Sequence, residues 1–393
     1  MAESFYEEFK EYYGKMVAWR RYLHQNPELS FQETNTAKFI ADQLKRFGIE
    51  VKEKVGGNGV VGVIEGGRPG KTIAFRADFD ALPIQDEKTA DYKSQVQGVM
   101  HACGHDGHTS SLLAVAKVLS SKQQQLNGKV VFIFQPAEEK PPGGAKFMIE
   151  DGVLDGVDYV FGGHLATEYQ IGKIATRSGA VMASVDAFKI TLQGRGGHGA
   201  RPHQTIDTVA IGSQLVGHLQ QIVSRRISPV EPAVVTIGSF HAGTAFNIIA
   251  DTAVLEGTVR SLNAEVRKQI ESEIRAILEG IKVADHIDYS LDYLHGYPVL
   301  VNHKEEALLI EKIVTETFSP DAFIEKGIAL GAEDFAYYLE QRPGAFFFVG
   351  ASNEQVETQF PHHHPRFDFD ERALLNLGRV FLKLVDFYMV RND

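Results

Sequence analysis

The sequence predicts an α/β fold: a mixed, largely parallel sheet covered by helices, with a smaller βαββαβ (ferredoxin-like) domain inserted into it. The chain has 393 residues, more than one simple core usually spans, so two domains are expected. Several short runs are apolar on both faces, as buried strands of a parallel sheet are. From about residue 184, strands with one polar face alternate with amphipathic helices.

Two helices are predicted at the start of the chain. Apolar residues over 5–23 recur at intervals of four and three, which indicates one amphipathic helix that ends near the Asn26-Pro27 pair. A second apolar face covers 37–47, and Gly48 stands where a helix terminator is expected.

The buried strands of the sheet are predicted from short apolar runs that follow these helices. The runs are "TIAF" (72–75), "KVVFIF" (129–134), "DYVF" (158–161) and "AFFFV" (345–349). All four are too short for typical helices. The stretch "SSLLAVAKVL" between the first two runs predicts a helix that connects two parallel strands.

The inserted domain is predicted over 184–296. It begins with "DAFKITLQG", in which apolar and polar residues alternate, and continues with a helix, two strands, a helix and a final strand. This order is that of a split-βαβ unit. The larger domain is therefore expected to comprise 1–183 and 297–393.

Composition and charge limit the classes of partner. The chain carries 40 Lys and Arg against 51 Asp and Glu, a net charge of −11, and its basic residues form no stripe. We therefore expect neither nucleic acid nor an anionic membrane as a partner. No apolar run approaches the roughly 20 residues of a membrane helix. The start lacks the features of a signal peptide, and one cysteine allows no intrachain disulfide, so a cytoplasmic protein is expected.

Polar residues follow the predicted strands. Asp78 and Asp80 come after the first run, "QPAEE" follows the second, and "GGH", with His164, follows the third. The octapeptide "HACGHDGH" (101–108) precedes the connecting helix. In open α/β sheets, ligands bind beyond the carboxyl ends of the strands. Each of these residues alone has an ordinary structural explanation, but their convergence on one edge indicates a site.

The residue types in this set indicate a metal centre. Thiolate, imidazole and carboxylate ligands suit zinc, with manganese, cobalt or nickel as alternatives. The candidate ligands are Cys103, His105, Glu139, His164 and one histidine of 362–364. They exceed the needs of one tetrahedral ion, so two ions about 3.5–4 Å apart, sharing a water, are expected. Glu138 diverges from its neighbour Glu139, and we expect it to act as the general base.

The chain resembles the di-metal aminoacylase and peptidase superfamily, in its subgroup of hippurate hydrolases, N-acetyldiaminopimelate deacetylases and auxin-conjugate hydrolases. The resemblance runs nearly from end to end. It rests on "RRYLHQNPELSFQE", "RADFDALP", "GVMHACGHDGH", "QPAEE", "GGH", "GRGGHGARPH", "FNIIADTAVLEGTVR", "GAEDFA" and "HHPRFDFDE", in that order.

The resemblance implies roles for the metal site. The histidine of the H-x-P motif, His363, is the implied C-terminal ligand, with His362 as its rival. The other implied ligands and the base are those named above. Asp78 and Asp80 are expected to orient ligands, because metal-bound histidines usually need a partner. His101 and His108 are candidates for the same supporting role, or for helix-cap and core positions.

It also implies roles for the inserted domain, which would be a lid and a dimerisation domain. His198 would stabilise an oxyanion, and Asn247 and Arg260 would bind the amide or carboxylate of the substrate. In "GAEDFA", Gly331 would line the pocket. A homodimer through the lid is expected, because its sheet has edges that can pair with a second copy.

The predicted reaction is hydrolysis of an N-acyl amino acid, with acetyl, benzoyl or a similar acyl group, to a carboxylate and a free amino acid. A dipeptidase or carboxypeptidase would share every catalytic residue, so it is the first alternative. A catalytically silent, metal-bound receptor for small amides is the second, and the presence of Glu138 argues against it.

Overall fold

The computed structural model describes residues 2–354 and 356–390, and the chain forms two compact units. Unit 1 comprises Met1–Val181, Val301–Gly327 and Asp334–Asp393. Unit 2 comprises Met182–Leu300 and the short later segment Ile328–Glu333. Among the described residues, the helices are either too short or too polar to span a lipid bilayer.

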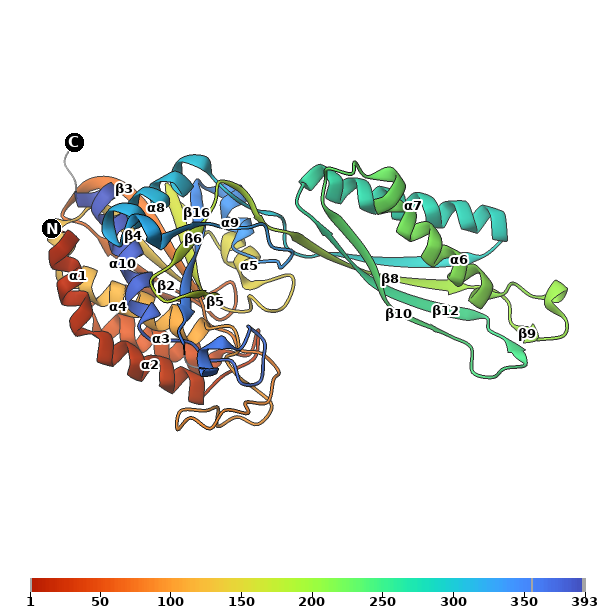
Figure 1. Cartoon of the computed structure of the whole chain (residues 1–393), viewed down its shortest axis with the longest axis horizontal. Helices are drawn as coiled ribbons and strands as arrows, with labels where there is room; N and C mark the ends of the chain where they lie inside the picture. The colour runs from red at the N-terminus through yellow and green to blue at the C-terminus, as the bar shows by residue number, and fades with distance from the viewer. Residues whose placement is uncertain (1, 355, 391–393) are drawn as a thin grey trace. The chain divides into compact units, whose positions relative to one another are not determined.

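Unit 1 is built on an eight-stranded sheet with the order β1-β2-β4-β3-β5-β16-β6-β15 (Figure 1). Neighbours β3, β4, β5 and β16 pair in parallel, whereas β1, β2 and β4 pair antiparallel. The sheet is therefore mixed with a parallel centre, as predicted. Its strands are β1 (Glu50–Val55), β2 (Gly59–Glu65), β3 (Arg68–Asp78), β4 (Asn127–Gln135), β5 (Tyr159–Gln170), β6 (Ile174–Thr176), β15 (Phe323–Glu325) and β16 (Gly344–Ser352).

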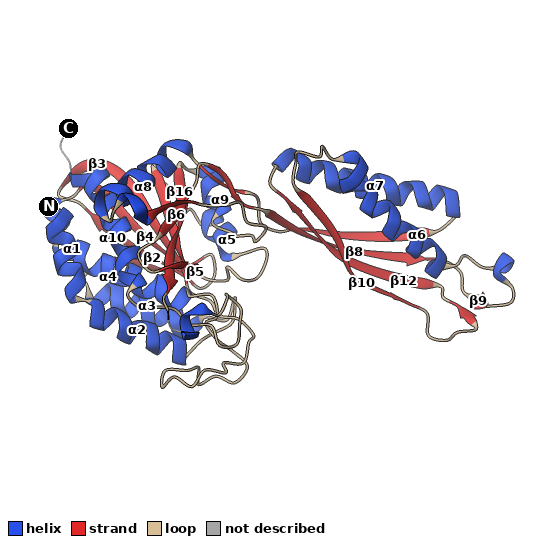
Figure 2. Ribbon diagram, viewed as in Figure 1, coloured by secondary structure: helices blue, strands red, loops and turns tan. Residues whose placement is uncertain are grey.

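Helices cover both faces of this sheet (Figure 2). Alternate strand residues such as Phe75 and Phe132 are fully buried in a large apolar core with residues of α1 to α4, α8 and α10. The opposite face is covered by α5 and α9 (Figure 2). The helices are α1 (Ala2–Glu11), α2 (Tyr13–Gln25), α3 (Thr34–Arg46), α4 (His105–Ser121), α5 (Gly144–Glu150), α8 (Lys304–Thr317), α9 (Ala336–Gln341) and α10 (Ala373–Val385).

The N-terminal helix predicted over 5–23 is two helices, so that prediction was wrong in one detail. Tyr12 separates α1 from α2, with φ −81° and ψ 0°, and Lys15 N donates to its carbonyl over three residues. Phe9 and Met16, one on each side of this break, are both fully buried in the same core. The apolar spacing therefore continues through the break and could not locate it. The second helix and the positive φ of Gly48, 76°, agree with the prediction.

Unit 2 is a four-stranded antiparallel sheet of order β10-β12-β8-β13, with α6 and α7 over one face (Figure 1). Its main elements follow the predicted βαββαβ order, and the two helices share an apolar core with the sheet. They are β8 (Ser184–Gln193), α6 (Thr208–Gln221), β10 (Ala233–Ala242), β12 (Thr252–Ser261), α7 (Ala264–Asp285) and β13 (Asp288–His295).

Short elements complete the chain. Two-residue strands β9 (Gly197–His198) and β11 (Ile248–Ile249) pair with each other, and β7 (Gly179–Met182) pairs with β14 (Leu300–Asn302). Short helical turns are η1 (Gln123–Gln125), η2 (Pro202–Gln204), η3 (Ile222–Arg226), η4 (Pro320–Ala322), η5 (Val356–Gln359) and η6 (Asp386–Val390).

Candidate metal centre

The candidate site of unit 1 lies where the parallel strands end. Asp78 is the last residue of β3, and Asp80 follows it by two positions. Glu138 and Glu139 follow the end of β4, and α4 begins at His105. The sheet edge therefore carries the carboxylates that the sequence placed there.

His164 differs from the expectation that it follows a strand, because it lies inside β5. The strand predicted over 158–161 continues through Gly162 and Gly163 to Gln170, and His164 pairs with Phe348 of β16. A β-carbon at Gly162 would lie 2.8 Å from Phe346. The glycines thus allow close packing within the strand and do not mark its end.

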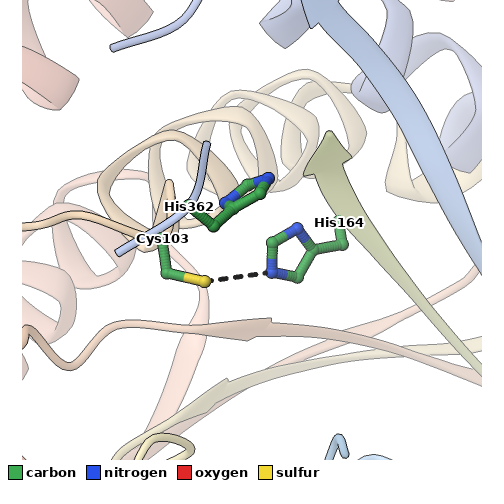
Figure 3. A group of neighbouring side chains, drawn as sticks. All are labelled: Cys103, His164 and His362. Carbon is green, nitrogen blue, oxygen red and sulfur yellow. Dashed lines mark hydrogen bonds between the residues drawn. The ribbon is translucent and has the colours of Figure 1, made fainter. Parts of the chain in front are cut away.

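Two groups of potential ligands share the sulfur of Cys103. The donor atoms of Cys103, His105 and Glu139 lie within 4.8 Å of one another, and so do those of Cys103, His164 and His362. Figure 3 shows the second group, in which Cys103 Sγ is 3.5 Å from His164 Nε2. A sulfur common to two donor groups is the arrangement expected of a ligand that bridges two cations.

Several of these atoms are buried with their polar requirements unmet. His105 Nε2, Glu139 Oε1 and His362 Nδ1 have no hydrogen-bond partner among the described residues. Glu139 Oε1 does have an ion-pair contact, 3.3 Å from His363 Nε2. Buried lone pairs without partners are costly unless they bind something. The donor set therefore fits metal cations.

The pKa shifts of the site residues also favour a site for cations. Burial raises the pKa of the Cys103 thiol well above its usual range, and Glu139 and Glu138 raise it further. Burial also lowers the pKa of His164, which keeps the imidazole neutral and able to bind metal. Burial opposes protonation of His105 as well, but Asp78 and Asp80 outweigh it and raise the pKa to about 10. A cation beside these carboxylates would take the place of that proton.

Asp80 connects two of the candidate ligands. Its Oδ1 lies 3.2 Å from His105 Nδ1, which leaves His105 Nε2 for the donor group. Its Oδ2 accepts from the backbone N–H of Glu139 at 3.0 Å and from the hydroxyl of Ser30 at 2.6 Å. One carboxylate thus orients both a ring and a backbone segment, as supports of metal ligands do.

Asp78 belongs to a buried chain of ion pairs that the sequence did not reveal. It accepts from Arg76 Nη1 at 2.6 Å and from His108 Nδ1 at 2.6 Å. Arg76 also donates to Asp334 at 2.8 Å, which gives the "GAEDFA" segment a structural role. His108 Nε2 accepts from the backbone N–H of Leu165 at 2.9 Å. The one available signal was an arginine directly after the apolar run "TIAF".

A second buried network lies beside the octapeptide. His24 contacts Asp106 at 2.7 Å and Asp86 at 3.2 Å, and Arg20 donates to Asp106 at 3.0 Å. His101 is buried next to it, with neither ring nitrogen hydrogen-bonded among the described residues. Neither Arg20 nor His24 was predicted as a site residue, although both belong to the "RRYLHQNPE" motif.

The C-terminal histidines approach both donor groups. His362 is partly buried, with its ring 5.1 Å from that of His164, whereas the side chain of His363 is 52% exposed. His363 N donates to Ala102 O at 2.8 Å, which fixes this loop to the octapeptide. Its φ of 65° is unusual for a residue with a side chain. The structure therefore brings both rivals to the centre.

The candidate residues in unit 2 fall into two places. His198 and Asn247 are exposed neighbours, since Gly199 N donates to Asn247 O at 2.9 Å and His198 pairs with Ile248. Arg260 pairs with Val185 at the other end of the sheet. Eight strand residues separate it from the end near His198, a span of roughly 26 Å at about 3.3 Å per residue. Within unit 2, Arg260 and His198 are thus not together. Gly331 is exposed, and its carbonyl accepts from Ala183 N.

Comparisons with known proteins identify the family of this chain. A family model described as peptidase family M20/M25/M40 matches residues 74–386. The protein YhaA of Bacillus subtilis, named as an amidohydrolase, is 51% identical over 94% of this chain and 93% of its own length. Thermostable carboxypeptidase 2 of Saccharolobus solfataricus is 43% identical over 97% of this chain and 96% of its own length. The hippurate hydrolase of Campylobacter jejuni is 41% identical over 96% of this chain and 97% of its own length.

A solved structure is similar over nearly the whole chain. The YXEP protein of Bacillus subtilis, described as a dinuclear metal-binding peptidase of the M20 family, superimposes with a TM-score of 0.82. It is 35% identical and covers 96% of this chain and 98% of its own. With the family match across most of the chain, these similarities set the receptor alternative aside. The chain belongs to peptidase family M20/M25/M40 and is a hydrolase that acts on amide bonds.

Proposed function

We propose that this protein hydrolyses N-acyl amino acids to a carboxylate and a free amino acid. Its relatives include proteins named hippurate hydrolase and amidohydrolase, both matched over more than nine-tenths of the chain. The observation that carries the proposal is the shared Cys103 sulfur between two donor groups, with Glu138 next to the ligand Glu139. Such an arrangement suits activation of a water for attack on an amide.

Two divalent cations would be held by Cys103, His105, Glu139, His164 and the C-terminal histidine His363. Zinc or manganese suits this mixture of sulfur, nitrogen and oxygen donors best, with cobalt and nickel as alternatives. When bound, such a pair of ions supplies positive charge that polarises the amide carbonyl and lowers the pKa of a water. The family relative described as dinuclear supports the count of two.

Glu138 would act as the general base. Its side chain is nearly buried, at 7% exposure, and it follows β4 in the segment that also carries Glu139. It would take a proton from the attacking water as the new C–O bond forms. It would then give that proton to the nitrogen as the C–N bond breaks, so one carboxylate serves as base and then as acid.

Unit 2 would supply the remaining substrate contacts. His198 would donate to the developing oxyanion, and Asn247 would bind the amide. Because Arg260 lies roughly 26 Å from His198 within unit 2, the two residues would contact one substrate from different protomers of the homodimer. Arg260 would bind the carboxylate of the amino acid, which would let a protein of net charge −11 accept an anionic substrate. Gly331 would line the pocket. We also propose a homodimer through unit 2, whose sheet has β10 and β13 as its edges. With a single cysteine, we expect the enzyme in the cytoplasm.

A dipeptidase or carboxypeptidase is the second candidate, favoured by the similarity to thermostable carboxypeptidase 2. The test is a panel of N-acetyl and N-benzoyl amino acids against unblocked dipeptides, after reconstitution with zinc, manganese, cobalt or nickel. We expect the acyl amino acids to have kcat/KM values at least about tenfold higher, a difference of about 1.4 kcal/mol in activation free energy. The reverse ranking would assign a peptidase.

The same assay tests the base. Glu138→Ala should lower kcat at least about 100-fold, to a small residual rate, while bound metal, measured by elemental analysis, stays near the wild-type amount. Retained turnover would remove Glu138 from this role. Lost metal would instead make it a ligand.

A further inference from the structure

The loop between α2 and α3 lies against the segment that follows β3. Ala81 N donates to Glu28 O at 2.9 Å, and Ser30 Oγ donates to Asp80 Oδ2 at 2.6 Å. These two contacts fix the loop along the residues that follow β3. Glu33 is the last residue of the loop, and its side chain is fully buried.

Glu33 occupies the N-cap position of α3 without capping it. Its carboxylate accepts no hydrogen bond from the first turn of the helix. Glu28 takes that role, since its two oxygens accept from Asn35 N at 3.2 Å and Thr36 N at 2.8 Å. Ser, Thr, Asp or Asn would be the usual N-cap. Helix formation therefore does not explain a buried glutamate at position 33.

The carboxylate of Glu33 reaches the segment of the base instead. Oε1 accepts from the backbone N–H of Ala137 at 2.9 Å and of Phe31 at 2.9 Å, and Oε2 accepts from Asn58 Nδ2 at 3.0 Å. Ala137 is fully buried and has a φ of 55°, a backbone conformation that costs energy for any residue with a side chain. The hydrogen bond from Ala137 N helps to hold that conformation.

Glu138 is thus flanked by two anchored peptide N–H groups. The one before it, at Ala137, is held by Glu33, and the one after it, at Glu139, is held by Asp80. The two carboxylates come from different segments of the chain. Together they set the direction in which the side chain of Glu138 leaves the backbone.

We propose that Glu33 is a positioning residue for catalysis, which holds the strained backbone at Ala137 so that Glu138 points at the reacting water. This proposal rests on the proposed role of Glu138 as the base. A general base must lie within hydrogen-bond reach of the proton it removes, and a displacement of about 1 Å can cost on the order of 100-fold in rate. The burial of Glu33, which raises its pKa to about 7, shows that the fold retains this carboxylate at a cost.

Three variants at position 33 separate positioning from structural support. Glu33→Ala removes the acceptor, Glu33→Asp shortens the side chain, and Glu33→Gln keeps an oxygen that can accept from Ala137 N. Asn58→Ala is the matched control, because it removes only the contact to Oε2. The assays are kcat, KM, bound metal and thermal unfolding, using whichever acyl amino acid or dipeptide the wild-type enzyme hydrolyses.

We expect kcat to fall at least about tenfold in Glu33→Ala and Glu33→Asp, with KM and bound metal within about twofold of the wild-type values. Glu33→Gln and Asn58→Ala should keep kcat within about threefold. If Glu33→Ala does not fold, Glu33→Asp and Glu33→Gln decide the question. Equal kcat in Asp, Gln and wild-type enzymes would overturn the proposal, and so would a loss of metal that accounts for the lost rate.

A double variant distinguishes this proposal from the proposed function. If Glu33 acts through Glu138, adding Glu33→Ala to Glu138→Ala should change the residual rate by less than about twofold. A full further loss would overturn the positioning role. If Glu138→Ala keeps its activity, the proposed base is wrong, whatever position 33 does. If Glu138→Ala is inactive and Glu33→Ala is fully active, only the inference about Glu33 fails.

Discussion

His108 and Asp78 are joined by a 2.6 Å hydrogen bond between Nδ1 and Oδ1, with both side chains buried. His108 Nε2 accepts from Leu165 N, so the ring is held between the end of β3 and the strand that carries His164. Asp78 also accepts a hydrogen bond from Arg76. Arg76 in turn donates to Asp334, which lies 258 residues further along the chain. This buried chain of charges joins three segments under the candidate metal centre.

Asp78→Ala should destabilise unit 1 strongly. It removes the partner of His108 and one partner of Arg76, and breaking a buried ion pair costs roughly 3–5 kcal/mol. The measurement is urea denaturation followed by the fluorescence of Trp19, the chain's one tryptophan, which is 5% exposed in the core of unit 1. Asp42→Ala, which breaks an exposed pair with Lys38, is the control and should leave the midpoint unchanged. Equal midpoints for both variants would contradict the role of Asp78.

Local patterns predicted the parts of the fold that depend on nearby residues. The buried strands around Phe75 and Phe132 were predicted from short apolar runs, and the βαββαβ order of unit 2 was predicted from hydrophobic periodicity. The position of His164 was wrong because glycines in a strand look like glycines at its end. The break at Tyr12 leaves the periodicity unchanged.

Contacts between distant segments could not be predicted in this way. Glu33 and Ala137 are 104 residues apart, and no sequence pattern around either residue predicts a contact with the other. Arg76 and Asp334 are further apart still. The candidate ligands could be recognised in the sequence because metal ions bind only a few types of side chain. The residues that orient these ligands are ordinary polar residues, and their partners depend on the tertiary fold.

Gly378→Ala should destabilise the packing of α10 against α1. A β-carbon at this position would lie 2.1 Å from Phe9 Cζ, and Phe9 is fully buried, so the ring cannot move away freely. Overpacking of this kind costs about 1–3 kcal/mol. Gly14→Ala in α2 is the matched control, because its β-carbon would meet nothing within 4 Å. Gly14→Ala should instead raise the free energy of unfolding by about 0.5–1 kcal/mol. Denaturation followed by Trp19 fluorescence measures both, and a stabilised Gly378→Ala would show that this contact is not tight.

Glu33 should make the stability of unit 1 depend on pH. Burial raises its pKa to about 7 from the ordinary 4.5, so between these values the folded protein holds a proton that the unfolded chain releases. The free energy of unfolding therefore falls as the pH rises through this window. Glu33→Gln removes that titration. The free energy of unfolding of Glu33→Gln, relative to that of the wild-type protein, should increase by up to about 3 kcal/mol between about pH 5 and about pH 8. A difference that does not vary with pH would mean that Glu33 titrates normally in the folded protein.

Metal content should distinguish the two C-terminal histidines. The H-x-P motif assigns the ligand to His363, whose Nε2 lies 3.3 Å from Glu139 and whose backbone is held at a φ of 65°. The ring of His362 instead packs against the rings of His164 and Phe367, at 5.1 and 4.8 Å. We expect His363→Ala to lose about half of the bound metal after reconstitution and gel filtration, because one ion loses a ligand.

His362→Ala is the matched control for this experiment and should keep nearly all of the metal. Elemental analysis of both variants, with either zinc or manganese, measures the outcome directly. Because His362 Nδ1 is buried without a hydrogen-bond partner among the described residues, it has the chemistry to serve as the ligand instead. A loss of metal in His362→Ala alone would assign the ligand to it and leave His363 as a partner of Glu139. Loss in both variants would mean that the loop must keep both rings to hold either ion.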